Sequence, residues 1–255
     1  METPQEGQET MNEILNRLRE EKAQNCKNGL YRKTQIEFAY NSNRIEGSKL
    51  TREQTRYIFE TNTLPFDDEN PTLQVDDLLE TVNHFACFDY LLDSAERALS
   101  EEIIKNFHRK LKSNTADSRK SWFAAGDYKK LPNEVADMPT ALPKDVPQKM
   151  ADLVENYRNK GNVTLLTLLD FHKDFEDIHP FQDGNGRVGR LILFRECLYF
   201  DMIPFIITDD IKYYYYRGLK MYRKERGCLR DTCLTARDRY ESYLKYFDIP
   251  HADKK

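Results

Sequence analysis

Apolar residues recur at steps of three and four over most of the chain, which is the spacing that one face of an α-helix requires. The clearest case covers residues 75–92 and contains Val75, Leu78, Leu79, Val82, Phe85, Ala86 and Tyr90. The same spacing predicts helices near residues 11–18, over 31–45, from Ser100 onward, and over 164–177, 187–200, 208–224 and 230–247. Strand-like alternation is weak throughout. The sequence therefore predicts a mostly α-helical fold.

The sequence also indicates where some helices begin and where loops lie. Ser100 precedes two glutamates and is a favourable N-cap, while Thr51 followed by Gln54 matches a capping box, so a short helix is expected there. Residues 61–73 and 113–147 collect prolines and lack the helical pattern. Because the second stretch is long for a loop inside a compact domain, we expect it to be functional. A small hairpin is possible within 124–137.

Composition excludes several classes of protein. The chain has 255 residues, which is long enough to bury a hydrophobic core. Its formal net charge is −4, so the composition does not indicate a basic surface for nucleic acid. Its five cysteines are odd in number and form no C-x-x-C pair, which argues against a disulfide framework or a zinc site. No apolar run is long enough to span a bilayer, and the polar start does not resemble a signal peptide. We expect a cytoplasmic protein, of bacterial type.

The richest segment for chemistry runs from His179 to Arg190 and reads HPFQDGNGRVGR. It joins two predicted helices. Gly184 and Gly186 flank Asn185, so the backbone can adopt tight or left-handed conformations there. The helix that follows begins near Gly186, and its first N–H groups lack acceptors inside the helix. This arrangement predicts an anion site.

Charged residues of the same segment extend that site. Arg187 and Arg190 are three apart and lie on neighbouring positions of one helical face, which suits a polyphosphate. Asp183 offers a hard oxygen ligand of the kind that holds Mg²⁺ together with substrate phosphates. His179 titrates near neutral pH and is a candidate base. One short loop thus offers a base, a metal ligand, an anion hole and two phosphate-binding side chains.

Two other interpretations of this segment are possible. Residues 184–189 also satisfy the dinucleotide pattern G-x-G-x-x-G, but that pattern needs a preceding strand, and the preceding residues have helical spacing. The second interpretation is a simple solvated turn with a capping residue. The joint presence of His179, Asp183 and both arginines argues against it.

The twelve residues resemble the signature of the Fic family, H-P-F-x-[D/E]-G-N-G-R-x-x-R, at every fixed position. The resemblance extends from about residue 75 to 225. It includes a flap that begins at Gly126, Asp127, Tyr128 and Lys129, with lysine at position 129 where arginine is common. The resemblance implies a Fic-domain helical fold with a small β-hairpin flap that docks a target segment.

Roles for these residues follow from the resemblance. His179 would deprotonate a target hydroxyl, which would attack the α-phosphorus of ATP. Asp183 would hold Mg²⁺. The α- and β-phosphates would lie on Gly184, Asn185 and Gly186, and the β- and γ-phosphates on Arg187 and Arg190. Phe181 would anchor the loop in the core.

A second constellation lies upstream at residues 42–47, SNRIEG. Ser42 and Glu46 are four apart, so they share one face of a helix that Gly47 would end. By itself this pattern is typical of an exposed helix end. Beside the Fic signature it resembles the family's inhibitory motif, [S/T]-x-x-x-E-[G/N], placed before the catalytic core in the same chain. The resemblance implies that Glu46 pairs with Arg190 and inhibits transfer.

The predicted protein is thus an autoinhibited protein adenylyltransferase that modifies Tyr, Thr or Ser of a target protein and of itself. Residues 1–70 would carry the inhibitory motif, 71–248 the catalytic core and 249–255 a tail. ATP would be the co-substrate, with Mg²⁺ as cofactor, no nucleic acid or membrane as partner, and a homodimer as the expected assembly. Alternatives are the removal of AMP, another nucleotide or phosphate donor, or a non-enzymatic nucleotide-binding module.

Overall fold

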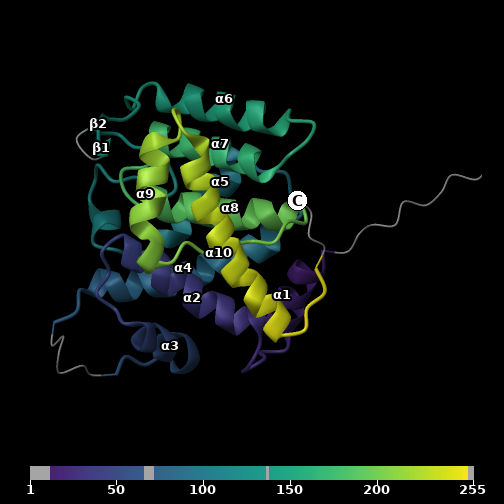
Figure 1. Ribbon diagram of the computed structural model, residues 1–255. Helices are drawn as coiled ribbons and strands as arrows, with labels where there is room; N and C mark the ends of the chain where they lie inside the picture. The colour runs from purple at the N-terminus through teal and green to yellow at the C-terminus, as the bar shows by residue number, and fades with distance from the viewer. Residues whose placement is uncertain (1–11, 66–71, 136–137, 252–255) are drawn as a thin grey trace, which may run out of the picture.

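The structure is a computed structural model that describes residues 12–65, 72–135 and 138–251 (Figure 1). Helices dominate these residues. They are α1 (Glu13–Ala23), α2 (Leu30–Ile45), α3 (Arg52–Thr61), α4 (Val75–Ser94), α5 (Glu101–Leu111), α6 (Val146–Arg158), α7 (Leu165–Ile178), α8 (Asn185–Tyr199), α9 (Lys212–Met221) and α10 (Arg226–Tyr246). Strands β1 (Glu134–Val135) and β2 (Met138–Pro139) form one antiparallel hairpin. The prediction of a mostly α-helical fold is confirmed.

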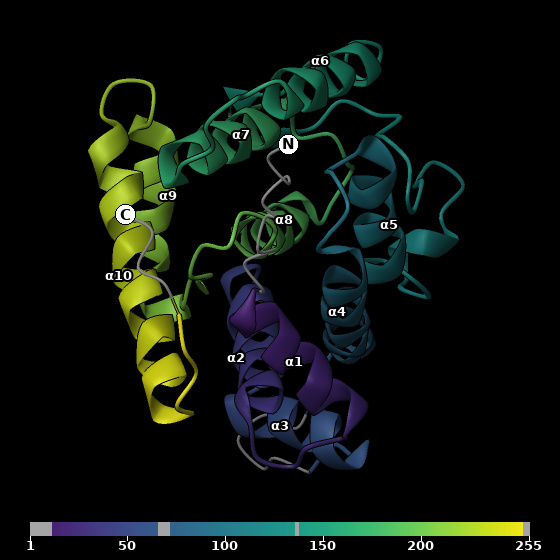
Figure 2. The same cartoon turned by 90° about the vertical axis from the view of Figure 1, so that its right-hand side faces the viewer.

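Helix α8 forms the centre of the molecule. In Figure 2 it is seen end-on, with α6 and α7 on one side, α9 and α10 on another, α1 and α2 on a third, and α4 and α5 on the fourth. All its residues except Gly186 and Tyr199 are buried. A helix that is enclosed all round presents each of its faces to a neighbour. Side chains from α2, α4, α5 and α7 therefore reach the first turn of α8.

The helix starts agree with the sequence analysis. The Thr51 hydroxyl accepts from the Gln54 N–H, the Gln54 side chain accepts from the Thr51 N–H, and Ser100 accepts from the Ile103 N–H. The three histidines that lie on helices outside the motif are packed in the interior, and so are Cys87 and Cys197. Side chains of the core that come from both sides of residue 70 belong to one apolar cluster. The division of the chain at that residue stays a prediction.

Four expectations need correction. Helix α6 was missed, and Pro147, expected in the loop, lies in its first turn, where proline costs no hydrogen bond. The expected helix 208–224 divides into a 3₁₀ turn (Asp209–Ile211) and α9, and α10 begins at Arg226 rather than near 230. The two paired strands are 134–135 and 138–139, so only the first lies within the expected range of 124–137.

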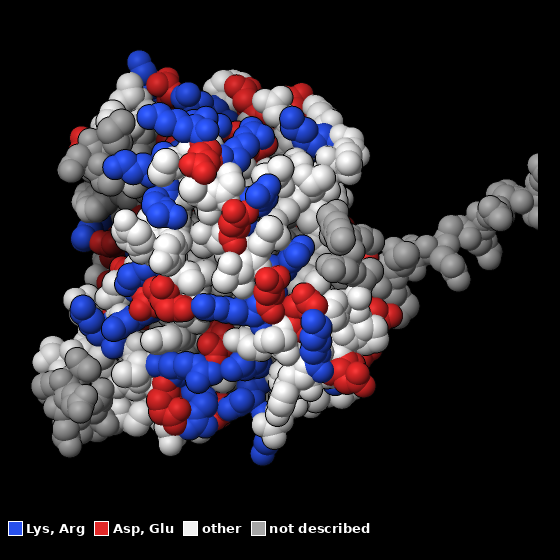
Figure 3. Space-filling model, in the orientation of Figure 1, with Lys and Arg blue, Asp and Glu red and all other residues white. Residues whose placement is uncertain are grey.

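The surface mixes the two signs of charge. On the face shown in Figure 3, lysine and arginine side chains lie among aspartates and glutamates, without a large region of one sign. Many of these groups are paired, for example Arg239 with Asp210 and Arg223 with Asp177. None of the helices in the described part of the chain is long and apolar enough to cross a membrane.

Candidate functional site

The turn between α7 and α8 is held in one conformation by two left-handed residues and one amide. His179 ends α7 with φ +51°, and Gly184 begins α8 with φ +82°. Between them, the Asn185 side chain accepts from the Phe181 N–H at 2.8 Å and donates to the Phe181 carbonyl at 2.8 Å. This double contact fixes the loop before any ligand binds. A non-glycine side chain at position 184 would be strained because its φ lies in the left-handed region.

Phe181 anchors the turn in the interior, as the sequence analysis expected. Its ring is fully buried and stacks on His108, with centroids 4.0 Å apart. His108 Nδ1 accepts from the Gly126 N–H at 2.9 Å, so its Nε2 carries the hydrogen and donates to the Asp183 carbonyl at 3.1 Å. Burial lowers the pKa of His108 to about 3 and keeps it neutral. One histidine thus ties α5, the turn at Gly126 and the motif together.

The first turn of α8 faces a carboxylate from α2. A Cβ added at Gly186 would lie 2.5 Å from Glu46 Oε1 and 3.0 Å from Arg190 Nη1. Glu46 therefore reaches the end of α8 where N–H groups have no helical acceptor and where an anion is stabilised. A side chain at position 186 would therefore displace this carboxylate.

Arg190 is bound by the end of α2. Its Nη2 donates to Glu46 Oε1 at 2.7 Å and to the Ser42 carbonyl at 2.9 Å, and its Nε lies 3.1 Å from Ser42 Oγ. Burial alone would lower the pKa of Arg190, but Glu46 raises it, so the guanidinium is charged. Helix α2 ends at Ile45, and Gly47 turns the chain away with φ +102°. Ser42 and Glu46 thus share one face, as their spacing predicts.

Arg187 has a different set of partners. It forms an ion pair with Glu80 of α4, lies 3.3 Å from Asp183 Oδ2 and 3.4 Å from Asn43 Oδ1. Its side chain is almost fully buried. The two motif arginines, expected to bind phosphates, therefore each carry a glutamate partner from a helix outside the motif.

Lys112 completes a cluster that the sequence analysis missed. This residue follows α5, is 2% exposed, and its ammonium lies 2.6 Å from Asp183 Oδ2 and 2.5 Å from Glu80 Oε1. Two cations and two carboxylates thus alternate, and the net charge of the four is zero. A further carboxylate, Asp117, lies 3.8 Å from the ammonium. Because Glu80 and Asp183 lie 32 and 71 residues from Lys112 in the chain, no local spacing predicts this cluster.

Asp183 suits a shared cation site. Burial would raise the pKa of its carboxyl, but Arg187 and Lys112 lower it to about 2, so it is ionised at neutral pH. Its side chain is 49% exposed. Among the described residues, no group of three or more His, Cys, Asp or Glu converges on one point. A single accessible carboxylate is what Mg²⁺ uses when phosphates supply the other ligands. The residues present fit a cation bound together with a nucleotide.

His179 is neutral and mostly buried. Burial, and then the positive charge of Lys129, lower the pKa of its imidazole to about 4. A neutral imidazole accepts protons, which is what a base requires. Its Nδ1 atom is buried and makes no hydrogen bond of normal length. The nearest carboxylate oxygen is Glu176 Oε2, at 4.0 Å.

The flap residues named from the sequence have buried side chains. Because Tyr128 and Lys129 are enclosed, docking of a target would use the backbone of the flap, as strand addition does, and this docking stays a prediction. The Tyr128 hydroxyl donates to Glu101 at 2.5 Å, and the Lys129 N–H donates to the Pro180 carbonyl at 2.8 Å. Together with Gly126, which donates to His108, they tie the base of the flap to the motif. The exposed apolar side chains nearby are Leu131 and Val135.

The four consecutive tyrosines at the start of α9 differ in how far they are buried. Tyr215 is buried and its hydroxyl lies 2.6 Å from His172 Nε2, whereas Tyr213, Tyr214 and Tyr216 are exposed. Partial burial, and then the charge of Glu46, raise the pKa of Tyr216 to about 12. Of the four, Tyr215 and Tyr216 therefore lie toward the site.

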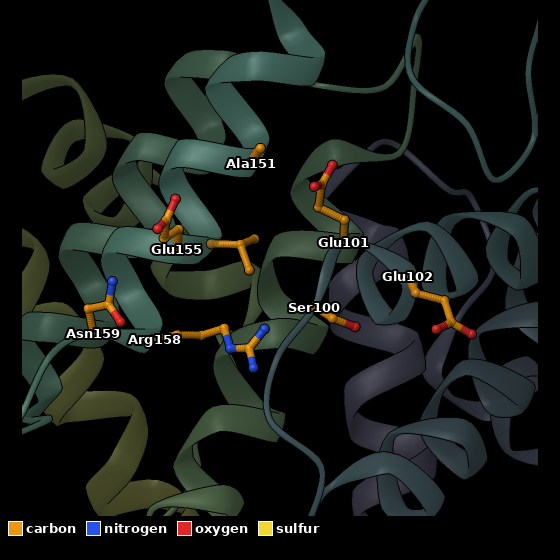
Figure 4. A pocket seen from close by; sticks show the side chains of 8 residues that line it. Ser100, Glu101, Glu102, Ala151, Glu155, Arg158 and Asn159 are labelled. Carbon is orange, nitrogen blue, oxygen red and sulfur yellow. The ribbon is translucent and has the colours of Figure 1, made fainter.

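A cavity of about 660 Å³ lies elsewhere, between the start of α5 and α6 (Figure 4). Its lining residues are Ser100, Glu101, Glu102, Ala151, Val154, Glu155, Arg158 and Asn159. None of them belongs to the motif or its partners. Three glutamates against one arginine also make it a poor place for a phosphate.

The contribution of the ion pairs around Lys112 can be tested by measuring the stability of the fold. Replacing Lys112 with methionine should lower the free energy of unfolding by about 2–3 kcal/mol, because Glu80 and Asp183 lose their shared cation. The half-exposed Asp183 keeps the loss below that of a fully buried pair. Urea unfolding followed by circular dichroism measures it. Lys110→Met, on the exposed side of α5, is the matched control. Equal losses for the two variants would show that the cluster contributes no stability.

Comparison with known proteins shows similarity to Fic proteins. Residues 98–196 match the Fic/DOC family. Over 192 residues the chain is 28% identical to a protein named protein adenylyltransferase Fic from Nematostella vectensis, and the match covers 72% of this chain and 42% of the relative. Over 197 residues it is 26% identical to protein adenylyltransferase fic-1 from Caenorhabditis elegans, covering 74% of this chain and 37% of that one. The chain thus spans about two fifths of these curated relatives.

Solved structures share the fold. A Fic domain containing signaling protein from Bacteroides thetaiotaomicron superposes with a TM-score of 0.73 at 23% identity, covering 92% of this chain and 91% of that one. Fic-1 from Caenorhabditis elegans, residues 134–508, gives a TM-score of 0.72 at 21% identity, covering 92% of this chain and 72% of that one. At this identity the likeness concerns the fold.

Proposed function

We propose that this chain, whose residues 98–196 match the Fic/DOC family, is an enzyme that transfers AMP from ATP to a hydroxyl side chain of a target protein. The observation that carries the proposal is the convergence of a neutral His179, an ionised Asp183 and the two motif arginines on the first turn of α8. The names of the matched relatives agree with AMP transfer. Tyr, Thr and Ser are the candidate acceptors.

The proposed step is an in-line displacement. His179 Nε2 takes the proton of the target hydroxyl, and the hydroxyl oxygen forms a bond to the α-phosphorus of ATP. The bond from the α-phosphorus to the bridging oxygen breaks, and pyrophosphate leaves with the electron pair. The N-terminus of α8 faces the growing negative charge, and Arg187 and Arg190 bind the outer phosphates. Catalysis then depends on positioning and on fixed positive charge.

Asp183 is the residue that would hold Mg²⁺. Bound there with the phosphates, Mg²⁺ would neutralise part of their charge and that of the leaving pyrophosphate. Lys112 and Arg187 keep the Asp183 carboxyl ionised and oriented before the nucleotide arrives.

We also propose that Glu46 inhibits this reaction. Its carboxylate holds Arg190 at 2.7 Å and lies against Gly186, where the nucleotide phosphates would bind. A nucleotide that enters beside Glu46 meets a like charge and lacks one guanidinium, so its α-phosphate is displaced from the line of attack. Release of Glu46 would restore both.

Self-modification and the homodimer remain proposals, as does the cytoplasmic location. Exposed hydroxyls exist on the chain itself, among them Tyr213 and Tyr214 at the start of α9. They are candidates for self-modification because they lie on the same helix as Tyr215, which packs beside the motif.

The experiment uses ATP labelled at the α-phosphate and, in parallel, ATP labelled at the γ-phosphate, with Mg²⁺ and a cell lysate. Protein labelled only from the α-phosphate supports AMP transfer. Labelling only from the γ-phosphate would instead indicate a phosphotransferase. If the chain labels nothing, and instead releases AMP from an adenylylated protein, the reverse reaction is its activity. The Glu46→Gly variant is the chain to use, since inhibition would hide a signal.

A further inference from the structure

Buried polar atoms without partners gather where α7 meets α8. Among the residues that the structure describes, Glu176 Oε1, His172 Nδ1 and His179 Nδ1 are buried and make no hydrogen bond of normal length. Such atoms are rare in folded proteins and call for an explanation. His179 is the proposed base, but the proposed reaction uses neither Glu176 nor His172.

The three side chains form a row. Residues 172, 176 and 179 are spaced by four and three, so they lie on one face of α7 and its end. The row continues into α9, because the Tyr215 hydroxyl lies 2.6 Å from His172 Nε2. Glu176 therefore lies between a histidine held from one side and the proposed base on the other.

Gly189 of α8 leaves room for this row. A Cβ built there would lie 2.8 Å from Glu176 Oε1 and 2.8 Å from His172 Cε1. Any larger residue would displace the carboxyl or the imidazole. Position 189 is a free position in the signature that this chain resembles, so the glycine is explained by Glu176 and His172, not by the phosphate site.

We infer that Glu176 is a positioning residue for His179, an inference that rests on the proposed function. Its carboxylate accepts the hydrogen on His179 Nδ1, which leaves the lone pair on Nε2 for the target hydroxyl. The Nδ1 to Oε2 separation is 4.0 Å in this structure. Contacts of this kind are often long before substrate binds and tighten afterwards. The backbone carbonyl of Glu176 is the competing acceptor, since it raises the pKa of His179.

The charge of the carboxylate contributes as well. When His179 takes the proton, an imidazolium forms next to Glu176, and a carboxylate stabilises it without taking the proton. Burial raises the pKa of Glu176 to about 7, in part offset by Arg190. The titratable or charged groups that face Glu176 are Lys173 and Asp177 on α7, Arg190 on α8, Glu46 after α2, and His172, His179 and Tyr215.

Since the ionised carboxylate is the active form, the rate should rise with pH through the region near 7. The test compares kcat from pH 5.5 to 9 for Glu46→Gly and for the double variant Glu46→Gly/Glu176→Gln, which keeps the backbone carbonyl. We expect kcat to fall 10- to 100-fold, a part of what a general base contributes, with an unchanged KM for ATP. The rise of kcat near pH 7 should disappear.

Asp174→Asn is the matched control, because this carboxylate of α7 is 41% exposed and pairs with Arg223. It should leave kcat and the pH profile unchanged. Gly189→Ala is a second variant that keeps the charge of Glu176 and displaces its carboxylate, so it should lower kcat too. A Glu176→Gln variant with full kcat, or with a lower kcat and the same pH profile, would overturn the inference.

A measurement without substrate separates this inference from the proposed function. The His179 imidazole signals, followed by NMR from pH 5.5 to 9 in the full chain, should shift near pH 7 as the neighbouring Glu176 ionises, and this shift should be absent in Glu176→Gln. A His179 response to pH that is the same in both chains would refute the inference even if the Glu46→Gly parent labels no protein. Absence of labelling with a His179 response that depends on Glu176 would count against AMP transfer and leave the Glu176 contact standing.

Discussion

Replacement of Glu46 with glycine is expected to raise the rate of AMP transfer about 100-fold, the amount that a displacement of about 1 Å in the reacting group can cost. In the structure Glu46 holds Arg190 at 2.7 Å and fills the space above Gly186. Without the carboxylate, both the guanidinium and the first turn of α8 become free for phosphates. Initial rates of labelling from α-labelled ATP, at equal protein concentration, measure the change.

Two further variants show whether charge or volume inhibits. Glu46→Gln keeps the size of the side chain and removes its charge, so it should activate, though less than glycine does. Glu53→Gln alters an exposed glutamate on α3 and should have no effect. The free energy of unfolding of the Glu46→Gly variant should also be lower by about 1–3 kcal/mol, since the buried Arg190 loses its charged partner. Equal rates for wild-type and Glu46→Gly chains would rule out the inhibitory role.

Replacement of His179 with alanine in the Glu46→Gly chain should reduce transfer by a factor of about 10²–10⁴, the usual contribution of a general base. Binding of ATP should persist, because the proposed phosphate contacts come from other residues. Radiolabel transfer measures the first quantity, and titration calorimetry with ATP and Mg²⁺ measures the second. Loss of transfer with retained binding separates catalysis from a module that only binds nucleotide.

The matched control for this variant is His251→Ala. That histidine follows α10, where its ring contacts the Ile249 carbonyl and Glu241, far along the chain from the motif. It should leave both transfer and binding unchanged. If His179→Ala transfers AMP as fast as its parent, His179 is not the base, and the mechanism proposed here fails.

Local patterns were enough for much of the fold. The spacing of apolar residues identified α4, α7 and α8 closely, and the caps at Thr51 and Ser100 are where their side chains predict. Such features depend on residues within one or two turns, so a single chain reveals them. Helix α6 was missed because the prolines before it indicated a loop, although proline is well tolerated in a first helical turn.

The residues of the candidate site could also be predicted only in part. The motif His179–Arg190 is contiguous, and its chemistry follows from residue type and short spacing. Ser42 and Glu46 could be paired with Arg190 only through the resemblance to a family, and the structure then brings them within hydrogen-bond distance. Lys112 and Glu80 carry no local signal for the site, whereas Glu176 lies three residues before His179 and was overlooked.

The sequence alone thus predicted the motif residues and most of the helices, since both depend on neighbours in the chain. It did not predict the partners of the motif, since Lys112 and Glu80 meet Asp183 and Arg187 only because α4 and α5 pack against α8. The same packing buries the side chains of Tyr128 and Lys129 at the base of the flap. Contacts between distant segments depend on how apolar faces close around α8, and that arrangement is set by the whole core rather than by any one stretch of sequence.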